Sequence, residues 1–183
     1  MNSKKLKTKG KHDIMKRRMM FAVAAAILSA APGAMAQSTD SGNSTLSVSF
    51  GPEASISITN ATTTLSKSGT KFESFTGTTN FSYKIRTTQT SGTGSITVQV
   101  TTFSTDGPAV ADLSYTCTDT ASGTPCSTTG ASSSSGTNVV SFGADVHSAD
   151  GGDAASVTWT LVDRTGIKTG AYNSTATYTI SAS

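Results

Sequence analysis

The sequence alternates apolar residues with Ser and Thr in short runs over most of its length after residue 44. A period of two places the apolar side chains on one face of an extended strand and the hydroxyl side chains on the other. Helical spacing is not sustained in this part of the chain, so the runs predict half-buried β-strands. The runs are Leu46–Phe50, Ile56–Ile58, Phe81–Ile85, Ile96–Val100, Leu113–Cys117, Val157–Leu161 and Ala176–Ile180.

Turn-forming residues separate these runs, as at Gly51-Pro52, Asp106-Gly107-Pro108 and Asp150-Gly151-Gly152. Seven or more short strands between such turns predict an all-β domain of two antiparallel sheets packed as a sandwich. A single sheet closed on itself is the alternative arrangement. The longest irregular stretch is Thr118–Thr137, whose Ser and Gly content predicts a long exposed loop.

The first 36 residues have a different composition. Eight Lys and Arg residues precede residue 19, an uncharged apolar run of 13 residues follows at Met19–Ala31, and Ala34-Met35-Ala36 supplies small residues for cleavage. The apolar run is shorter than the roughly 20 residues that cross a bilayer as a helix. We expect 1–36 to be a secretory signal peptide of a bacterial precursor, and 37–183 to be one domain with a flexible start at 37–44.

Removal of this leader reverses the sign of the net charge. The whole chain has a formal charge of +3, but eight of its fourteen basic and one of its eleven acidic residues lie before residue 37. Six basic and ten acidic side chains remain, a formal charge of −4, so we expect neither nucleic acid nor a membrane span after cleavage. The expected location is the periplasm, the outer cell surface or the medium.

The chain has two cysteines, Cys117 and Cys126, and both follow the predicted leader. An oxidising compartment outside the inner membrane allows them to pair. Their spacing is too long for a C-x-x-C redox motif, and no further Cys is present to complete a metal site. The sequence therefore favours a structural disulfide over a redox or metal centre.

Few residues in this part of the chain are typical of catalysis or ligand binding. His147 is the only histidine after the leader, and no Gly-x-Ser-x-Gly motif accompanies it, so we expect no enzymatic activity and no cofactor. Asp145, Asp150 and Asp153 are a weak candidate for calcium, because their spacing does not match an EF-hand loop. Trp159 is in phase with Val157 and Leu161, which favours a place in the core over sugar stacking.

Two segments resemble known bacterial families. Gly170–Ile180 is similar to the closing strand of bacterial immunoglobulin-like domains and of pilin-like secreted proteins of the spore coat protein U type. Ser44–Phe50 resembles the alternating segment that begins mature pilin-like subunits. Ala54–Ser57 stands where these pilin-like proteins usually have an early cysteine. The resemblance implies an immunoglobulin-like sandwich of about seven to nine strands.

The same resemblance implies a structural function, in which the terminal strand of one subunit completes the sheet of another. Leu46, Val48 and Phe50 would then be the donated side chains, and the partner would be another copy or a related subunit. The alternative is that these residues form the first strand of their own domain. We expect an exported, non-enzymatic surface, fimbria-like or coat protein. The alternative function is a secreted module that binds a glycan or a matrix, through rings such as Trp159, Tyr115 or Tyr172.

Overall fold

The computed structural model describes residues 41–69, 71–119 and 121–183. The predicted signal peptide 1–36, and residues 37–40 of the predicted flexible start, lie outside the described residues. Residues 41–44 of that start are exposed and belong to no helix or strand. The domain proper begins at Leu46, and its first strand begins at Glu53.

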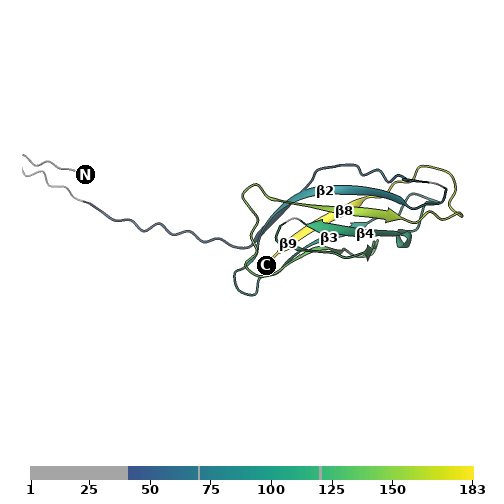
Figure 1. The fold of residues 1–183 in the computed structure, drawn as a ribbon. Helices are drawn as coiled ribbons and strands as arrows, with labels where there is room; N and C mark the ends of the chain where they lie inside the picture. Colours follow the sequence, from purple (N-terminus) through teal and green to yellow (C-terminus); the bar gives the residue numbers. More distant parts are fainter. Residues whose placement is uncertain (1–40, 70, 120) are drawn as a thin grey trace, which may run out of the picture. The chain divides into compact units, whose positions relative to one another are not determined.

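Two antiparallel sheets make up the domain, as the alternating pattern predicts, and the alternative of a single closed sheet is wrong (Figure 1). Sheet A contains, in spatial order, β1 (Glu53–Ile58), β2 (Phe75–Arg86), β8 (Asp153–Leu161), β4 (Leu113–Asp119) and β6 (Thr129–Gly130). Sheet B contains β5 (Thr124–Pro125), β7 (Thr137–Phe142), β3 (Gly94–Val100) and β9 (Ala176–Ala182). One 3₁₀ turn, η1 (Val110–Asp112), precedes β4. None of the described residues forms a helix long and apolar enough to cross a membrane.

The core is built from the apolar positions of the alternating runs. Trp159 is 4% exposed, its ring packs against Tyr115 with 5.2 Å between centroids, and its indole nitrogen donates to the Thr79 hydroxyl at 2.9 Å. The prediction that Trp159 lies in the core is therefore confirmed. The other buried apolar residues are Phe81, Tyr83, Ile85, Ile96, Val98, Val100, Val110, Leu113, Cys117, Val139, Val140, Phe142, Ala155, Val157 and Leu161.

Strand β7 was not among the predicted strands, because its apolar residues do not alternate. Val139 and Val140 are neighbours in sequence, and both are fully buried. The register between β3 and β7 shifts at this point, since Ile96 pairs with Val140 and Thr97 pairs with Asn138. A β-bulge thus adds one residue to β7 and lets two consecutive valines face the core.

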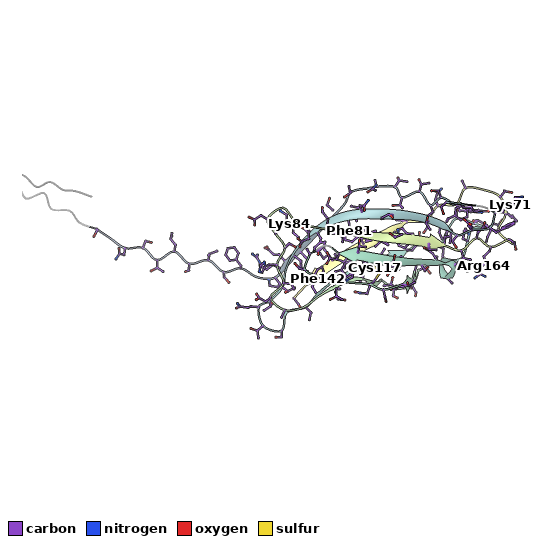
Figure 2. All side chains as sticks on the ribbon, in the orientation of Figure 1. Lys71, Phe81, Lys84, Cys117, Phe142 and Arg164 are labelled. Carbon is purple, nitrogen blue, oxygen red and sulfur yellow. A yellow bond between two sulfur atoms is a disulfide. The ribbon has the colours of Figure 1, made fainter. Side chains whose placement is uncertain are left out.

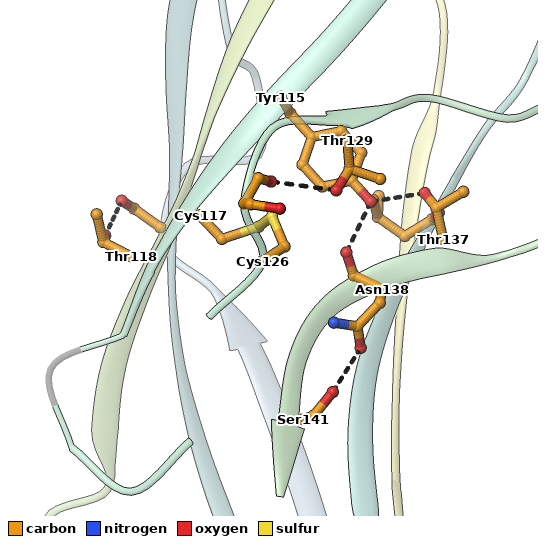
Figure 3. Close-up of a disulfide and its surroundings, with 11 residues drawn as sticks. Tyr115, Cys117, Thr118, Cys126, Thr129, Thr137, Asn138 and Ser141 are labelled. Carbon is orange, nitrogen blue, oxygen red and sulfur yellow. Dashed lines mark hydrogen bonds between the residues drawn. A yellow bond between two sulfur atoms is a disulfide. The ribbon is translucent and has the colours of Figure 1, made fainter. Parts of the chain in front are cut away.

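The predicted loop Thr118–Thr137 is more ordered than its composition suggests, so that prediction is wrong in part. Its first two residues belong to β4, and it contains the short strands β5 and β6. Cys126 forms the predicted disulfide with Cys117, with 5.1 Å between their Cα atoms, and its backbone N–H donates to the Val139 carbonyl at 2.8 Å (Figure 3). Backbone bonds and the disulfide therefore hold this segment, despite its Ser and Gly content.

The outer faces of both sheets consist largely of hydroxyl side chains. Thr78 and Thr158 share a hydrogen bond of 3.2 Å across β2 and β8, and Thr118 and Ser156 share one of 2.7 Å across β4 and β8. Sheet B has a similar contact of 3.2 Å between Ser95 and Ser181. Of the charged residues labelled in Figure 2, Lys84 lies towards one end of the sandwich, and Lys71 and Arg164 lie towards the other.

Candidate assembly surface

The domain has two sides at which the edges of its sheets meet, and they differ in how far they are closed. On one side, β5 lies beside β7 in sheet B and β6 lies beside β4 in sheet A. The chain that joins β5 to β6 therefore passes from one sheet to the other, and the disulfide fixes its start to β4. Tyr115 strengthens this side, because its hydroxyl donates to the Thr137 hydroxyl at 2.6 Å and lies 2.9 Å from the Asn138 carbonyl (Figure 3). We call this the closed side.

The other side is formed by β1 and β9, and we call it the open side. β1 is the edge of sheet A, β9 is the edge of sheet B, and the two strands lie next to each other. In the described part of the chain, β1 pairs only with β2 and β9 pairs only with β3. Each therefore has one backbone edge without a strand neighbour, which is the kind of edge to which another strand can add.

Core-facing side chains on the open side are incompletely covered. Ile56 lies opposite Tyr83 of β2, and Ile180 lies opposite Ile96 of β3. Tyr83 and Ile96 are buried at 2% and 0% exposure, whereas Ile56 and Ile180 are only half-buried. Among the described residues, the row of core side chains thus ends at the open side with no further strand beside β1 or β9. The residues of β1 and β9 that face inwards are Ala54, Ile56, Ile58, Ala176, Tyr178, Ile180 and Ala182.

Tyr178 shows the same incomplete packing in its polar group. Its hydroxyl is buried, yet it has no hydrogen-bond partner among the described residues. The nearby Thr79 hydroxyl already accepts from Trp159 and shares a hydrogen bond of 2.6 Å with Thr63. Burial raises the pKa of Tyr178 to about 12, because a phenolate there would lose its water. The polar groups of Thr79 and Trp159 would stabilise a phenolate, so they lower this pKa in part.

The open side also lacks the usual protection of exposed sheet edges. Natural edge strands commonly contain Lys, Pro or a bulge, which discourage pairing with another chain. Within β1 the only charged residue is Glu53, at its first position, and β9 contains no charge and no proline. Both strands are otherwise made of Ala, Ser, Thr, Ile and Tyr. Apart from Glu53, these two strands therefore contain none of the charged or proline residues that commonly block strand addition.

The segment before β1 exposes apolar side chains of the kind that could cover the half-buried residues of the open side. Leu46, Val48 and Phe50 are 95%, 76% and 71% exposed, and they alternate with Thr45, Ser47 and Ser49. No strand includes them, and the first strand of the domain is β1. In the described structure, Leu46, Val48 and Phe50 thus stand outside the domain's own sheets. A row of exposed apolar side chains at every second position is what a strand needs if its core face is to be covered by a partner.

Arg86 at the end of β2 holds the junction between this segment and β1. Its Nε donates to the Gly51 carbonyl at 3.0 Å, and its guanidinium lies 4.9 Å from the centroid of the Phe50 ring. The same guanidinium forms an ion pair of 2.7 Å with Glu53. No sequence motif singles out Arg86, because its partners become neighbours only through the pairing of β1 with β2.

The weak calcium candidates occupy different environments. Asp145 and Asp150 are exposed on the connection between β7 and β8, whereas Asp153 is buried at the start of β8, opposite Tyr83. One Asp153 carboxylate oxygen has no hydrogen-bond partner in the described structure. Over residues 41–69, 71–119 and 121–183, no three His, Cys, Asp or Glu side chains are grouped so that they could hold a metal ion.

The histidine and the aromatic residues considered for catalysis or sugar binding lie in different parts of the domain. His147 is exposed and forms an isolated bridge with Arg86. Trp159 and Tyr115 lie inside the core, which removes both rings as a platform for sugar stacking. The Tyr172 hydroxyl donates to the Lys168 carbonyl at 2.8 Å in the connection between β8 and β9.

Comparisons of this chain with models of protein families, with curated proteins and with solved structures find no match.

Proposed function

We propose that this chain is an exported, non-enzymatic subunit of a bacterial surface, fimbria-like or coat structure, with an immunoglobulin-like sandwich that assembles by strand addition. The observation that carries the proposal is the exposure of Leu46, Val48 and Phe50 in an alternating, uncharged segment. The half-buried inner residues of β1 and β9 support it from the receiving side. The signal-like leader and the small number of catalytic residue types agree with a structural function.

A single interaction, strand addition, would cover both the exposed apolar side chains of the segment before β1 and the half-buried inner residues of β1 and β9. The backbone of the segment from one copy would pair with a free edge of the open side of another copy, and alternate side chains would enter the core. Leu46, Val48 and Phe50 span about 13 Å in an extended chain, because each residue advances the strand by roughly 3.3 Å. Tyr178, Ile180 and Ala182 of β9 have the same spacing of two residues, so one side chain of the segment can meet each of them.

A pair of matched variants tests this proposal. Leu46→Asp with Val48→Asp places two charges on the face that would enter the core, whereas Ser47→Asp with Ser49→Asp places the same charges on the opposite face. We expect the protein purified without its leader to form higher-order species in size-exclusion chromatography and short fibres in electron microscopy. The Ser variants should keep most of this assembly, and the Leu46 and Val48 variants should be monomeric. A wild-type protein that is strictly monomeric, or equal behaviour of the two double variants, would contradict strand addition.

Engineered cysteines identify where the segment binds. The two native cysteines are bonded to each other, so Val48→Cys combined with Ile180→Cys adds a single new pair. Donation between copies predicts a ladder of disulfide-linked species on a non-reducing gel. Ser47→Cys combined with Ile180→Cys is the control, because Ser47 would face away from the core. A bond within one chain, seen as a faster monomer band, would show that the segment covers its own open side and would overturn assembly by donation.

A further inference from the structure

The segment before β1 is joined to its own open side by a very short linker. Only Gly51 and Pro52 separate Phe50 from Glu53, the first residue of β1. A strand tethered so closely to a free edge has an effective concentration in the millimolar range, provided that its linker can reach the edge. A second copy of the chain at micromolar concentration could not compete with such a tethered strand. Assembly between copies therefore requires that the segment be kept from its own open side.

The linker itself resists a tight reversal of the chain. Two residues can connect paired neighbouring strands when one or both of them have a positive φ. Gly51 is not among the described residues with a positive φ. Pro52 fixes its own φ near about −65° and disfavours helical conformations of the residue before it, which is Gly51. The chain thus enters β1 without the two-residue turn that would lay Phe50 beside this strand.

Arg86 holds the linker on the side of β1 that lies away from its free edge. Arg86 is the last residue of β2 and lies opposite Glu53, whereas the free edge of β1 is on the other side of that strand. Its Nε donates to the Gly51 carbonyl at 3.0 Å, and its guanidinium lies 4.9 Å from the centroid of the Phe50 ring. The ion pair of 2.7 Å with Glu53 completes this set of contacts. One side chain therefore draws the base of the segment towards β2.

The position of Arg86 does not depend on the segment. Its backbone pairs with β1 on one side and forms a bridge with His147 on the other. The next residue, Thr87, donates its N–H to the Val146 carbonyl at 2.9 Å. A guanidinium is planar and has donors that point in several directions, so one anchored arginine can hold a carbonyl and a carboxylate at the same time.

We propose that Arg86 is a positioning residue, which directs Leu46, Val48 and Phe50 to a second copy and prevents them from covering the open side of their own domain. The proposal rests on assembly by strand addition. Without Arg86, the linker can turn towards the free edge, and the segment adds to its own β1 or β9. Such a self-closed monomer neither donates a strand nor accepts one, so a growing assembly stops at it.

The cysteine pair Val48→Cys with Ile180→Cys gives a direct readout of this choice. Bonds between copies give a ladder on a non-reducing gel, and bonds within one chain give a faster monomer band. Arg86→Gln should increase the monomer band relative to the ladder roughly fivefold, which corresponds to the loss of an exposed cation–π contact and a surface ion pair. Lys84→Gln is the matched control, because Lys84 precedes Arg86 by two residues on the same face of β2 and lies opposite Ser55.

A milder variant guards against a loss of the fold. Arg86→Lys keeps the positive charge, but an ammonium lacks the planar fork that bonds Gly51 and Glu53 together. It should shift the bands in the same direction as Arg86→Gln, to a smaller extent, while circular dichroism shows an unchanged fold. Without the added cysteines, Arg86→Gln should elute as a monomer in size-exclusion chromatography at concentrations at which the wild type forms higher-order species.

The failure of this proposal is distinguishable from the failure of strand addition. If the cysteine pair gives a ladder with Arg86 present, and Arg86→Gln and Arg86→Lys leave the ratio of the bands at the value of Lys84→Gln, then Arg86 does not direct the segment. A ladder that weakens without a gain in the monomer band would show that Arg86 only stabilises β1, and would also overturn the proposal. The absence of a ladder with Arg86 present would contradict strand addition itself.

Discussion

The closed and open sides of the sandwich use the same kinds of residues in opposite ways. At the closed side, the sheets are linked by a disulfide and by a chain segment that pairs with both of them. At the open side, β1 and β9 lie next to each other, and the part of the chain that the structure describes adds no further strand to either of them. Tyr115 near the closed side is 1% exposed and its hydroxyl is satisfied, whereas Tyr178 on the open side is half-buried and its hydroxyl has no partner in the described structure.

The core is therefore more completely packed at the closed side than at the open side. Half-buried apolar residues contribute less to stability than fully buried ones, because the hydrophobic free energy scales with the area removed from water. Further burial of the half-buried residues at the open side, for example under an added strand, would therefore increase the free energy of unfolding. Four measurements test whether the two sides differ in this way.

The largest expected effect is that of Trp159→Ala, which should lower the free energy of unfolding by about 3 to 5 kcal/mol through the cavity it leaves. Ile56→Ala on the open side should cost only about 1 kcal/mol, since Ile56 is half-buried before the change. Urea denaturation of each variant measures both values, and Thr158→Ser on the outer face serves as a control within about 0.5 kcal/mol of wild type. Equal losses for Trp159 and Ile56 would refute the distinction between core and open side.

Removal of the disulfide should have the next largest effect. The bond closes a loop with a sequence separation of 9, for which chain entropy predicts about 2 to 3 kcal/mol of stabilisation. Cys117→Ala with Cys126→Ala should lose this amount in urea denaturation. Hydrogen exchange should increase in β5 and β6 while the β1 and β9 amides change little. Equal increases at both sides would show that the disulfide supports the whole sandwich and not the closed side.

Two matched removals of a hydroxyl group give a smaller but more selective test. Tyr115→Phe should cost about 1 to 2 kcal/mol, because it removes the donor to Thr137. Tyr178→Phe should be neutral or slightly stabilising, because it removes a buried hydroxyl that has no hydrogen-bond partner among the described residues. Thermal or chemical denaturation compares the two directly. A clear loss of unfolding free energy in Tyr178→Phe would mean that this hydroxyl forms a hydrogen bond and that the open side is better packed than its exposure indicates.

The smallest effect is expected from alkaline pH. The pKa of Tyr178 is about 12 in the folded protein and about 10 in the unfolded chain, so the unfolded state loses its proton first as the pH rises. The contribution of Tyr178 is therefore intact below pH 10 and declines through pH 12, by about 1 kcal/mol at pH 11. Burial raises the pKa of Tyr83 and of Tyr115 as well, so wild type should decline further than this one residue requires. The stability of Tyr178→Phe should fall less than that of wild type over this range. Identical profiles would show that Tyr178 does not titrate as described.

Much of the fold follows from the period of the sequence, and the exceptions have physical causes. The runs around Tyr83, Val98 and Trp159 alternate because each strand has one buried and one solvated face. β7 breaks this rule at Val139 and Val140, where a bulge turns consecutive residues inwards. Its enrichment in β-branched and aromatic residues between Gly136 and Gly143 was the remaining signal. β5 and β6 have two residues each, too few to show any period.

The residues of the candidate assembly surface were harder to predict from the sequence than the fold was. Leu46, Val48 and Phe50 show the same alternation whether their partner lies in the same chain or in another, so the pattern alone does not distinguish the two. Arg86 has no local signal at all, because its contacts with Phe50 and Glu53 arise only when β1 pairs with β2. The Cys117–Cys126 bond was predictable because only one intrachain pairing was possible.

The hydroxyl-covered outer faces have a consequence for how neighbouring molecules would approach one another. Like-charged surfaces repel over a distance that salt shortens, to about 10 Å at 0.1 M ionic strength. The face around Thr78, Thr158 and Ser156 carries hydroxyl and methyl groups in place of such charges. Contacts made through this face would therefore respond little to the salt concentration.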